Sequence, residues 1–83
     1  MSVAEKEKRT EAQVHDMIVR DAKRRFGCDH FAPEFTLYEY PGPVANWGVQ
    51  VAYTAAVWPV ECAEAFKEAV LRARGAFDIE WPR

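Results

Sequence analysis

Two stretches with the composition of β-strands flank a turn segment near the middle of the chain. Residues 35–40 (FTLYEY) and 47–57 (WGVQVAYTAAV) are rich in β-branched and aromatic residues, and the segment between them, PGPVAN, contains two prolines, a glycine and an asparagine. This pattern predicts a β-hairpin. Because successive side chains alternate between the two faces of a strand, Val49 and Val51 are expected on the core face and Gln50 on the opposite face.

The pairing register of the hairpin decides which side chains of its first strand join the core. A slip of one residue exchanges the two faces of a strand. We expect Phe35 to lie beside Tyr53 in the second strand. In the same register, Leu37 lies beside Val51, and the two tyrosines of the first strand point to the opposite face.

An amphipathic helix is predicted before the hairpin. Thr10 can cap its first turn, and Gln13 at the third helical position completes a weak capping box. Gly27 suits a left-handed conformation and ends the helix after Phe26. At about 100° per residue, the apolar side chains of this segment fall on one arc: Val14, Ile18, Val19, Ala22 and Phe26.

A second amphipathic helix is predicted after the hairpin, at about residues 59–74. Pro59 suits its first turn, and Gly75 suits its end. Short alanine side chains on its apolar face would allow a close approach to the sheet or to the first helix. That face comprises Cys62, Ala63, Phe66, Ala69, Val70 and Ala73.

The tail AFDIEWPR alternates Phe77, Ile79 and Trp81 with acidic residues, which predicts a third short strand. The element order is therefore α-β-β-α-β. This order predicts an α+β two-layer sandwich, in which a three-stranded, mainly antiparallel sheet carries two helices on one face. The third strand is expected beside the first; beside the second, it would make the sheet mixed.

Eighty-three residues make one domain with a small core. Residues 1–9 are mostly charged and are expected to form a flexible N-terminal arm, which leaves residues 10–83 as a single α+β domain. No apolar run approaches the roughly 18 residues that span a bilayer. Because the N-terminus also lacks the apolar segment of a signal peptide, we expect a cytoplasmic protein.

The charge balance bears on the class of partner. Eleven basic and thirteen acidic residues give a net charge of −2, which disfavours nucleic-acid binding driven by phosphate neutralisation. A basic run near the end of the first helix would favour nucleic-acid binding. The acidic residues at the start of the second helix disfavour it. The run consists of Arg20, Lys23, Arg24 and Arg25.

Four residues could carry metal or thiol chemistry: Cys28, Cys62, His15 and His30. Two cysteines are too few for a disulfide framework, so reduced thiols are expected. These residues lack the closely spaced pairs of Cys or His that are typical of a zinc site, so neither a metal nor a cofactor is predicted. His15 is interpreted as a core histidine with one hydrogen bond, and Cys28 and His30 as parts of a polar loop. The sequence leaves open whether the four converge.

The sheet face that the helices leave uncovered would be unusually aromatic. Such a face, together with open strand edges, favours self-association, whereas in a monomer the N-terminal arm or the PGPVAN segment would have to cover it. The predicted binding surface is Tyr38, Tyr40, Trp47, Gln50, Thr54 and Trp58.

No phosphate-binding loop and no nucleophile motif is present in the sequence, so a catalytic function is not favoured. We expect an interaction or ligand-binding domain that forms a homodimer or binds a protein partner through its sheet. The alternative is a small enzyme or ligand-binding subunit with a pocket at a dimer interface near Cys28 and His30.

Overall fold

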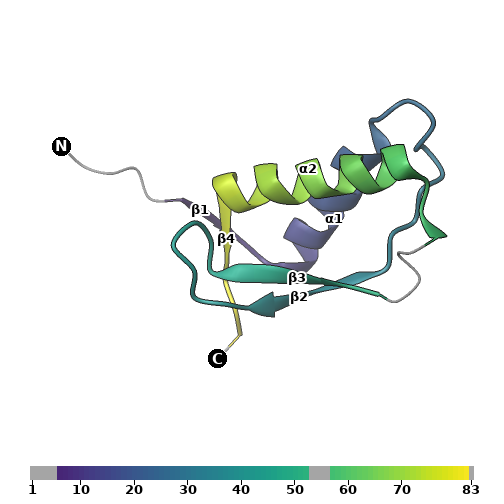
Figure 1. Ribbon diagram of the computed structural model, residues 1–83. Coiled ribbons are helices and arrows are strands. Elements are labelled where there is room, and N and C mark those ends of the chain that lie inside the picture. The colour runs from purple at the N-terminus through teal and green to yellow at the C-terminus, as the bar shows by residue number, and fades with distance from the viewer. Residues whose placement is uncertain (1–5, 53–56, 83) are drawn as a thin grey trace.

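The computed structural model describes residues 6–52 and 57–82, which contain two helices and four short strands (Figure 1). The strands form two small sheets, so the protein is a small α+β fold. Both helices lie on the same side of the β2–β3 hairpin. In chain order the elements are β1 (Glu7–Arg9), α1 (Glu11–Lys23), β2 (Phe35–Glu39), β3 (Trp47–Val51), α2 (Val60–Ala76) and β4 (Phe77–Ile79).

The predicted three-stranded sheet is wrong, because β4 pairs with β1 and not with the hairpin. The β1–β4 pair is parallel, with Glu7 opposite Phe77 and Arg9 opposite Ile79. Residues 7–9, which were expected in the flexible arm, thus form a strand. Their side chains are all charged, and the strand is held by backbone pairing with β4 and by the Arg9 guanidinium, which lies 5.6 Å from the centre of the Phe77 ring.

The predicted hairpin is confirmed, but its register differs by two residues. Phe35 lies opposite Val51 and Leu37 opposite Val49. The chain reverses more tightly than expected, because Gly42 N–H donates to the Ala45 carbonyl at 3.1 Å. A shift of two residues preserves the faces of a strand, so Phe35 and Leu37 are buried as predicted. The predicted neighbour of Phe35, at position 53, lies outside the described residues.

The first helix begins as predicted. The Thr10 hydroxyl accepts a hydrogen bond from Gln13 N–H at 3.2 Å, and the Gln13 side-chain oxygen accepts one from Thr10 N–H at 3.0 Å. The helix ends at Lys23, earlier than expected, and the chain then turns away from the helical path. Phe26 is therefore 96% exposed and does not join the core, although Gly27 has the expected left-handed φ of 86°.

The second helix continues through Gly75, which was expected to end it, and β4 follows without a loop. Ala63, which was expected on the apolar face, is only half-buried, whereas Ala65 is buried. The residues of α2 that are buried are Cys62, Ala65, Phe66, Ala69 and Ala73.

A disulfide joins Cys28, in the turn region after α1, to Cys62 in the first turn of α2. The expectation of reduced thiols is therefore wrong. The fold brings the two Cα atoms to 5.7 Å, a separation that a disulfide spans readily. Because the two cysteines are 34 residues apart in sequence, only the packing of α2 beside the end of α1 reveals the pair.

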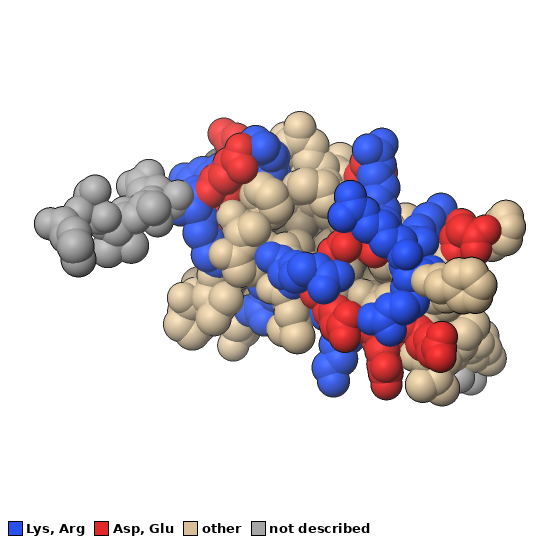
Figure 2. Space-filling model, turned by 90° about the horizontal axis from the view of Figure 1, so that it is seen from above, with Lys and Arg blue, Asp and Glu red and all other residues tan. Residues whose placement is uncertain are grey.

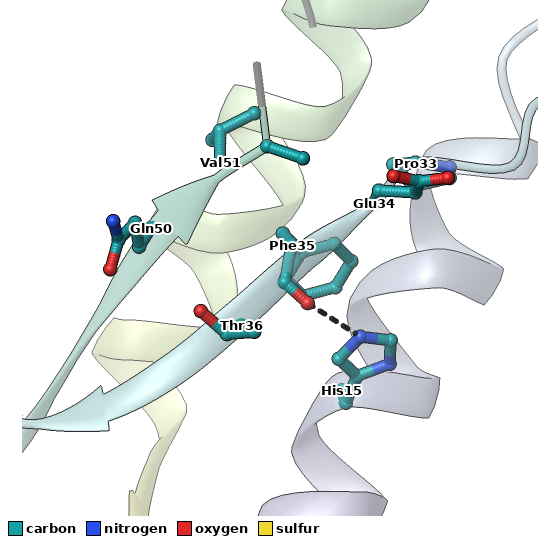
Figure 3. Close-up of a pocket in the computed structure, with 8 residues that line it drawn as sticks. His15, Pro33, Glu34, Phe35, Thr36, Gln50 and Val51 are labelled. Atoms are coloured by element: carbon teal, nitrogen blue, oxygen red, sulfur yellow. Dashed lines mark hydrogen bonds between the residues drawn. The ribbon is translucent and has the colours of Figure 1, made fainter. Parts of the chain in front are cut away.

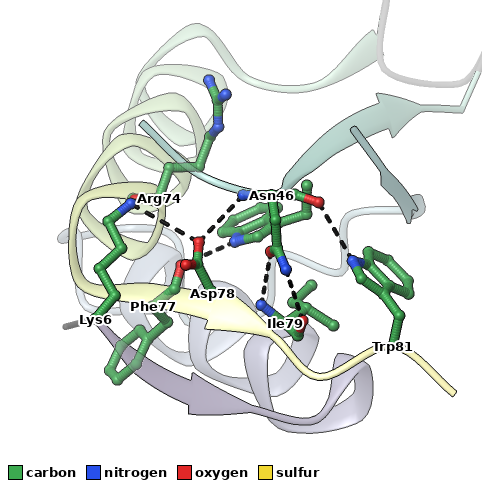
Figure 4. A network of polar contacts seen from close by, with 8 residues as sticks. Lys6, Asn46, Arg74, Phe77, Asp78, Ile79 and Trp81 are labelled. Atoms are coloured by element: carbon green, nitrogen blue, oxygen red, sulfur yellow. Dashed lines mark hydrogen bonds and ion pairs between the residues drawn. The ribbon is translucent and has the colours of Figure 1, made fainter. Parts of the chain in front are cut away.

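The two small sheets are joined by side chains at the end of the hairpin (Figure 4). The Trp47 indole N–H donates to the Phe77 carbonyl at 3.0 Å, and the Asn46 backbone N–H donates to the Asp78 carboxylate at 3.1 Å. The Trp81 indole N–H donates to the Asn46 carbonyl at 3.2 Å. These contacts fix β4 beside the start of β3 without a strand ladder between them.

Candidate functional site

The hairpin face that points away from the helices is the first candidate site. Alternation along β2 and β3 places Thr36, Tyr38, Gly48 and Gln50 on this face, which we call the open hairpin face. Tyr38 is 44% exposed, and Tyr40, just beyond β2, is 52% exposed. The two tyrosine rings meet edge to face with their centroids 6.4 Å apart.

Gly48 makes room for the Tyr38 ring. Tyr38 lies opposite Gly48 in the hairpin, and its ring covers the glycine backbone. A Cβ atom at Gly48 would lie 2.7 Å from the Tyr38 Cζ and Oη atoms, which is too close for a non-bonded contact. The absence of a side chain at position 48 therefore leaves the space that the Tyr38 ring occupies.

The outer edge of β2 adjoins the open hairpin face. The Glu34 carbonyl accepts a hydrogen bond from Ala52 N–H at 3.0 Å, so alternate residues from Glu34 onward bond to β3. The peptide groups of the residues between them, Phe35 and Leu37, point to the outer edge. The position of His15, whose Nε2 donates to the Phe35 carbonyl at 3.2 Å, agrees with this direction. No other described strand pairs with this edge.

A cavity of about 650 Å³ opens where α1 meets the hairpin (Figure 3). The His15 ring is half-buried in its wall and stacks on Phe35, with the ring centroids 4.0 Å apart and the planes inclined by 8°. Its hydrogen bond to the Phe35 carbonyl agrees with the predicted contact, but the ring is only half-buried, so His15 borders the core and is not part of it. Thr36 and Gln50 also line the cavity, so it is continuous with the open hairpin face.

The structure divides the predicted binding surface. Tyr38, Tyr40 and Gln50 are exposed together on the hairpin. Trp47 is fully buried. Trp58 is half-buried, because its ring packs edge-on against Phe31 and Phe66 at the border of the core. The sixth predicted residue, at position 54, lies outside the described residues.

Trp47 is therefore unavailable as a contact residue, and Trp58 exposes only part of its side chain, which lines a separate cavity. For Trp47, a signal was present in the sequence: it lies two residues before Val49 and so shares the core face of β3. The outer edge of β2 was missed because edge position depends on strand order, which local sequence does not specify.

The second predicted location, near Cys28 and His30, contains a cavity of about 320 Å³. His30 lines it together with Trp58 and Cys62. The His30 side chain is 98% exposed and lies 3.3 Å from the Asp29 carboxylate. Because Cys28 is 1% exposed and belongs to the disulfide, it offers no thiol to this cavity.

The part of the chain that the structure describes contains no group of three or more His, Cys, Asp or Glu side chains arranged to hold a metal ion. Among the described helices, none combines the length and the apolar character needed to cross a membrane. Comparisons with protein-family models, curated proteins and solved structures found no match. The function must therefore be argued from the geometry of the surface.

Proposed function

We propose that this protein is an interaction domain that forms a symmetric homodimer through the outer edge of β2. The observation that carries the proposal is the exposed Tyr38–Tyr40 pair beside a strand edge at which the Leu37 peptide groups point outward, whereas the outward Phe35 carbonyl already accepts from His15. Exposed aromatic rings supply large contact areas at low cost in conformational entropy, and an open strand edge supplies backbone donors and acceptors.

The edge of β2 suits pairing with a second copy. The strand contains no proline and one charged residue, so it lacks most of the features that block edge-to-edge contact. Isolated two-stranded hairpins are marginal, and antiparallel pairing of two β2 strands would create one four-stranded sheet. A two-fold axis at Leu37 would pair its outward peptide groups with those of Leu37 in the second copy.

The same axis predicts the contacts of the tyrosines. Residues equally distant from Leu37 on either side face each other, so Tyr38 would lie opposite Thr36 of the second copy on the open hairpin face. Tyr40 would lie opposite Glu34 of the second copy. The rings would then cover the new junction between the two hairpins.

Sedimentation tests this dimer through Tyr40→Glu. The wild-type chain should sediment at twice the chain mass, and the variant should sediment as a folded monomer because its carboxylate would face Glu34 of the second copy. Leu71→Glu is the matched control: Leu71 is 59% exposed on α2, so its replacement should leave the dimer intact. A monomeric wild-type protein, or an unchanged mass for Tyr40→Glu, would overturn the proposal.

A pocket at a dimer interface near Cys28 and His30 is the weaker alternative. Its support is the cavity that His30 shares with Trp58. Against it, the disulfide removes the Cys28 thiol, and His30 projects into solvent. His30→Ala should therefore leave both folding and self-association unchanged, whereas the alternative requires a change in ligand binding.

A cytoplasmic location remains our proposal; the Cys28–Cys62 disulfide counts against it, and the redox state of the two cysteines in cells provides the test. Disulfides are rare in cytosolic proteins because thiol reductants keep cysteines reduced. Rapid alkylation of thiols in intact cells should label both Cys28 and Cys62 if the protein resides in the cytoplasm. Failure to label them would instead favour an oxidising compartment.

A further inference from the structure

A groove of about 320 Å³ runs between α1 and α2. Figure 2 views the molecule from the helix side and shows Lys and Arg side chains gathered there, with Asp and Glu side chains between them. The rim of the groove carries the Asp21 carboxylate and three guanidinium groups, from Arg20, Arg24 and Arg72. Its floor includes Met17, Ala69 and Ala73. We call this feature the arginine groove.

The arginines differ in their pairing. The Arg72 Nε atom lies 2.8 Å from the Asp21 carboxylate, and the Arg20 Nε atom lies 3.0 Å from that of Asp16. The Arg24 guanidinium has no ion-pair or hydrogen-bond partner among the described residues, although it lines the groove. One guanidinium at the rim is therefore free to bind an external anion.

The local charge is opposite in sign to that of the whole chain. An adjoining hollow shares Arg24 and Arg72 with the groove and adds Arg25, which pairs with Glu68 at 2.6 Å. Groove and hollow together are lined by four arginines and two carboxylates, whereas the chain carries a net charge of −2. The lining of these two hollows is thus locally cationic, in contrast to the chain as a whole.

Two kinds of residue from α1 and α2 form the arginine groove. Short alanine side chains on α2 leave the floor shallow and apolar, while the arginines rise from the last turn of α1, the residue after it and the last part of α2. The hydrogen bond to Asp21 orients the Arg72 guanidinium at the groove and raises its pKa. A planar guanidinium can bind a carboxylate or a phosphate through two parallel hydrogen bonds.

We propose that the arginine groove binds an organic anion, whose phosphate or carboxylate group contacts Arg24 and Arg72 and whose apolar part lies on Met17, Ala69 and Ala73. A long polyanion such as nucleic acid fits less well. Asp21 and Glu68 lie between the arginines and would repel successive phosphates. A compact anion with one charged group can contact Arg24 and the Arg72 N–H groups that Asp21 leaves unbonded.

Titrations with hexyl phosphate and with hexanoate, followed by backbone amide chemical shifts, test this site. Either probe should cause saturable shifts in residues 20–24 and 69–73. Arg24→Gln should weaken binding about tenfold, because it removes a charged hydrogen-bond donor. Arg24 is exposed and unpaired, so this variant should fold normally. Lys67→Gln is the matched control: Lys67 is exposed and lines a different cavity, beside Val49 and Val51, so binding should not change.

Three results would overturn the proposal. The first is the absence of saturable shifts with both probes, and the second is equal affinity for wild-type protein and Arg24→Gln. The third is binding of inorganic phosphate as tight as that of hexyl phosphate, because the apolar floor would then contribute nothing. Saturable binding of only one probe supports the site and identifies the preferred anion. The arginine groove uses no residue of the β2 edge, so its test is independent of the proposed dimer.

Discussion

The side-chain amide of Asn46 pairs with the backbone of Ile79 as a neighbouring strand would. The Asn46 Nδ2 atom donates to the Ile79 carbonyl at 2.8 Å, and the Ile79 N–H donates to the Asn46 Oδ1 atom at 2.8 Å (Figure 4). Ile79 is 1% exposed, so neither of its peptide groups has ready access to water. The Asn46 side chain therefore satisfies both peptide groups of Ile79, and the Trp47 indole satisfies the Phe77 carbonyl on the same edge of β4.

Asn46→Ala should lower the free energy of unfolding by about 3 kcal/mol, because two buried peptide groups lose their partners. Urea unfolding followed by circular dichroism measures this change. Gln50→Ala is a suitable control, since Gln50 is exposed on the neighbouring strand and its replacement should cost little. A loss below about 1 kcal/mol for Asn46→Ala would mean that water replaces the amide.

Trp47→Ala should destabilise the protein by about 3–5 kcal/mol, as expected for truncation of a fully buried aromatic residue. Trp47→Phe retains most of the apolar volume but leaves the Phe77 carbonyl without its donor, so it should cost less. Chemical denaturation of both variants distinguishes a core residue from a surface residue. If both variants unfolded at the wild-type urea concentration, Trp47 would belong to the surface.

Local patterns identified several elements of this fold correctly. The capping box at Thr10 and Gln13 depends on residues three apart, and the burial of Phe35 depends on alternation within one strand. Both signals are contained in a few consecutive residues. They are therefore visible without knowledge of the rest of the chain.

Features that depend on distant segments were not predictable in this way. Strand β1 contains only charged residues and shows no apolar alternation, and it forms because β4 lies beside it. The Cys28–Cys62 disulfide likewise depends on helix packing. For the candidate site, alternation along the strand predicted that Tyr38 and Tyr40 lie on the face away from the helices, where both are exposed. The outward edge of β2 follows only from the observed pairing of the strands.

Gly48→Ala should destabilise the hairpin by about 1 kcal/mol, because the Tyr38 ring would have to move away from the new methyl group. The half-exposed ring can swing toward solvent, which limits the cost. A double-mutant cycle with Tyr38→Ala isolates the clash: Gly48→Ala should cost less when Tyr38 is already alanine. Equal costs in both backgrounds would mean that the ring does not restrict position 48.

Reduction of the disulfide should lower the free energy of unfolding by about 4 kcal/mol, the loop-entropy value for cysteines 34 residues apart. The physical reason is that the reduced chain gains many more unfolded conformations. Urea unfolding with and without dithiothreitol measures the difference. The double variant Cys28→Ser/Cys62→Ser should match the reduced protein and show no response to dithiothreitol. If dithiothreitol shifted the wild-type and double-variant transitions equally, the loss would not arise from the Cys28–Cys62 bond.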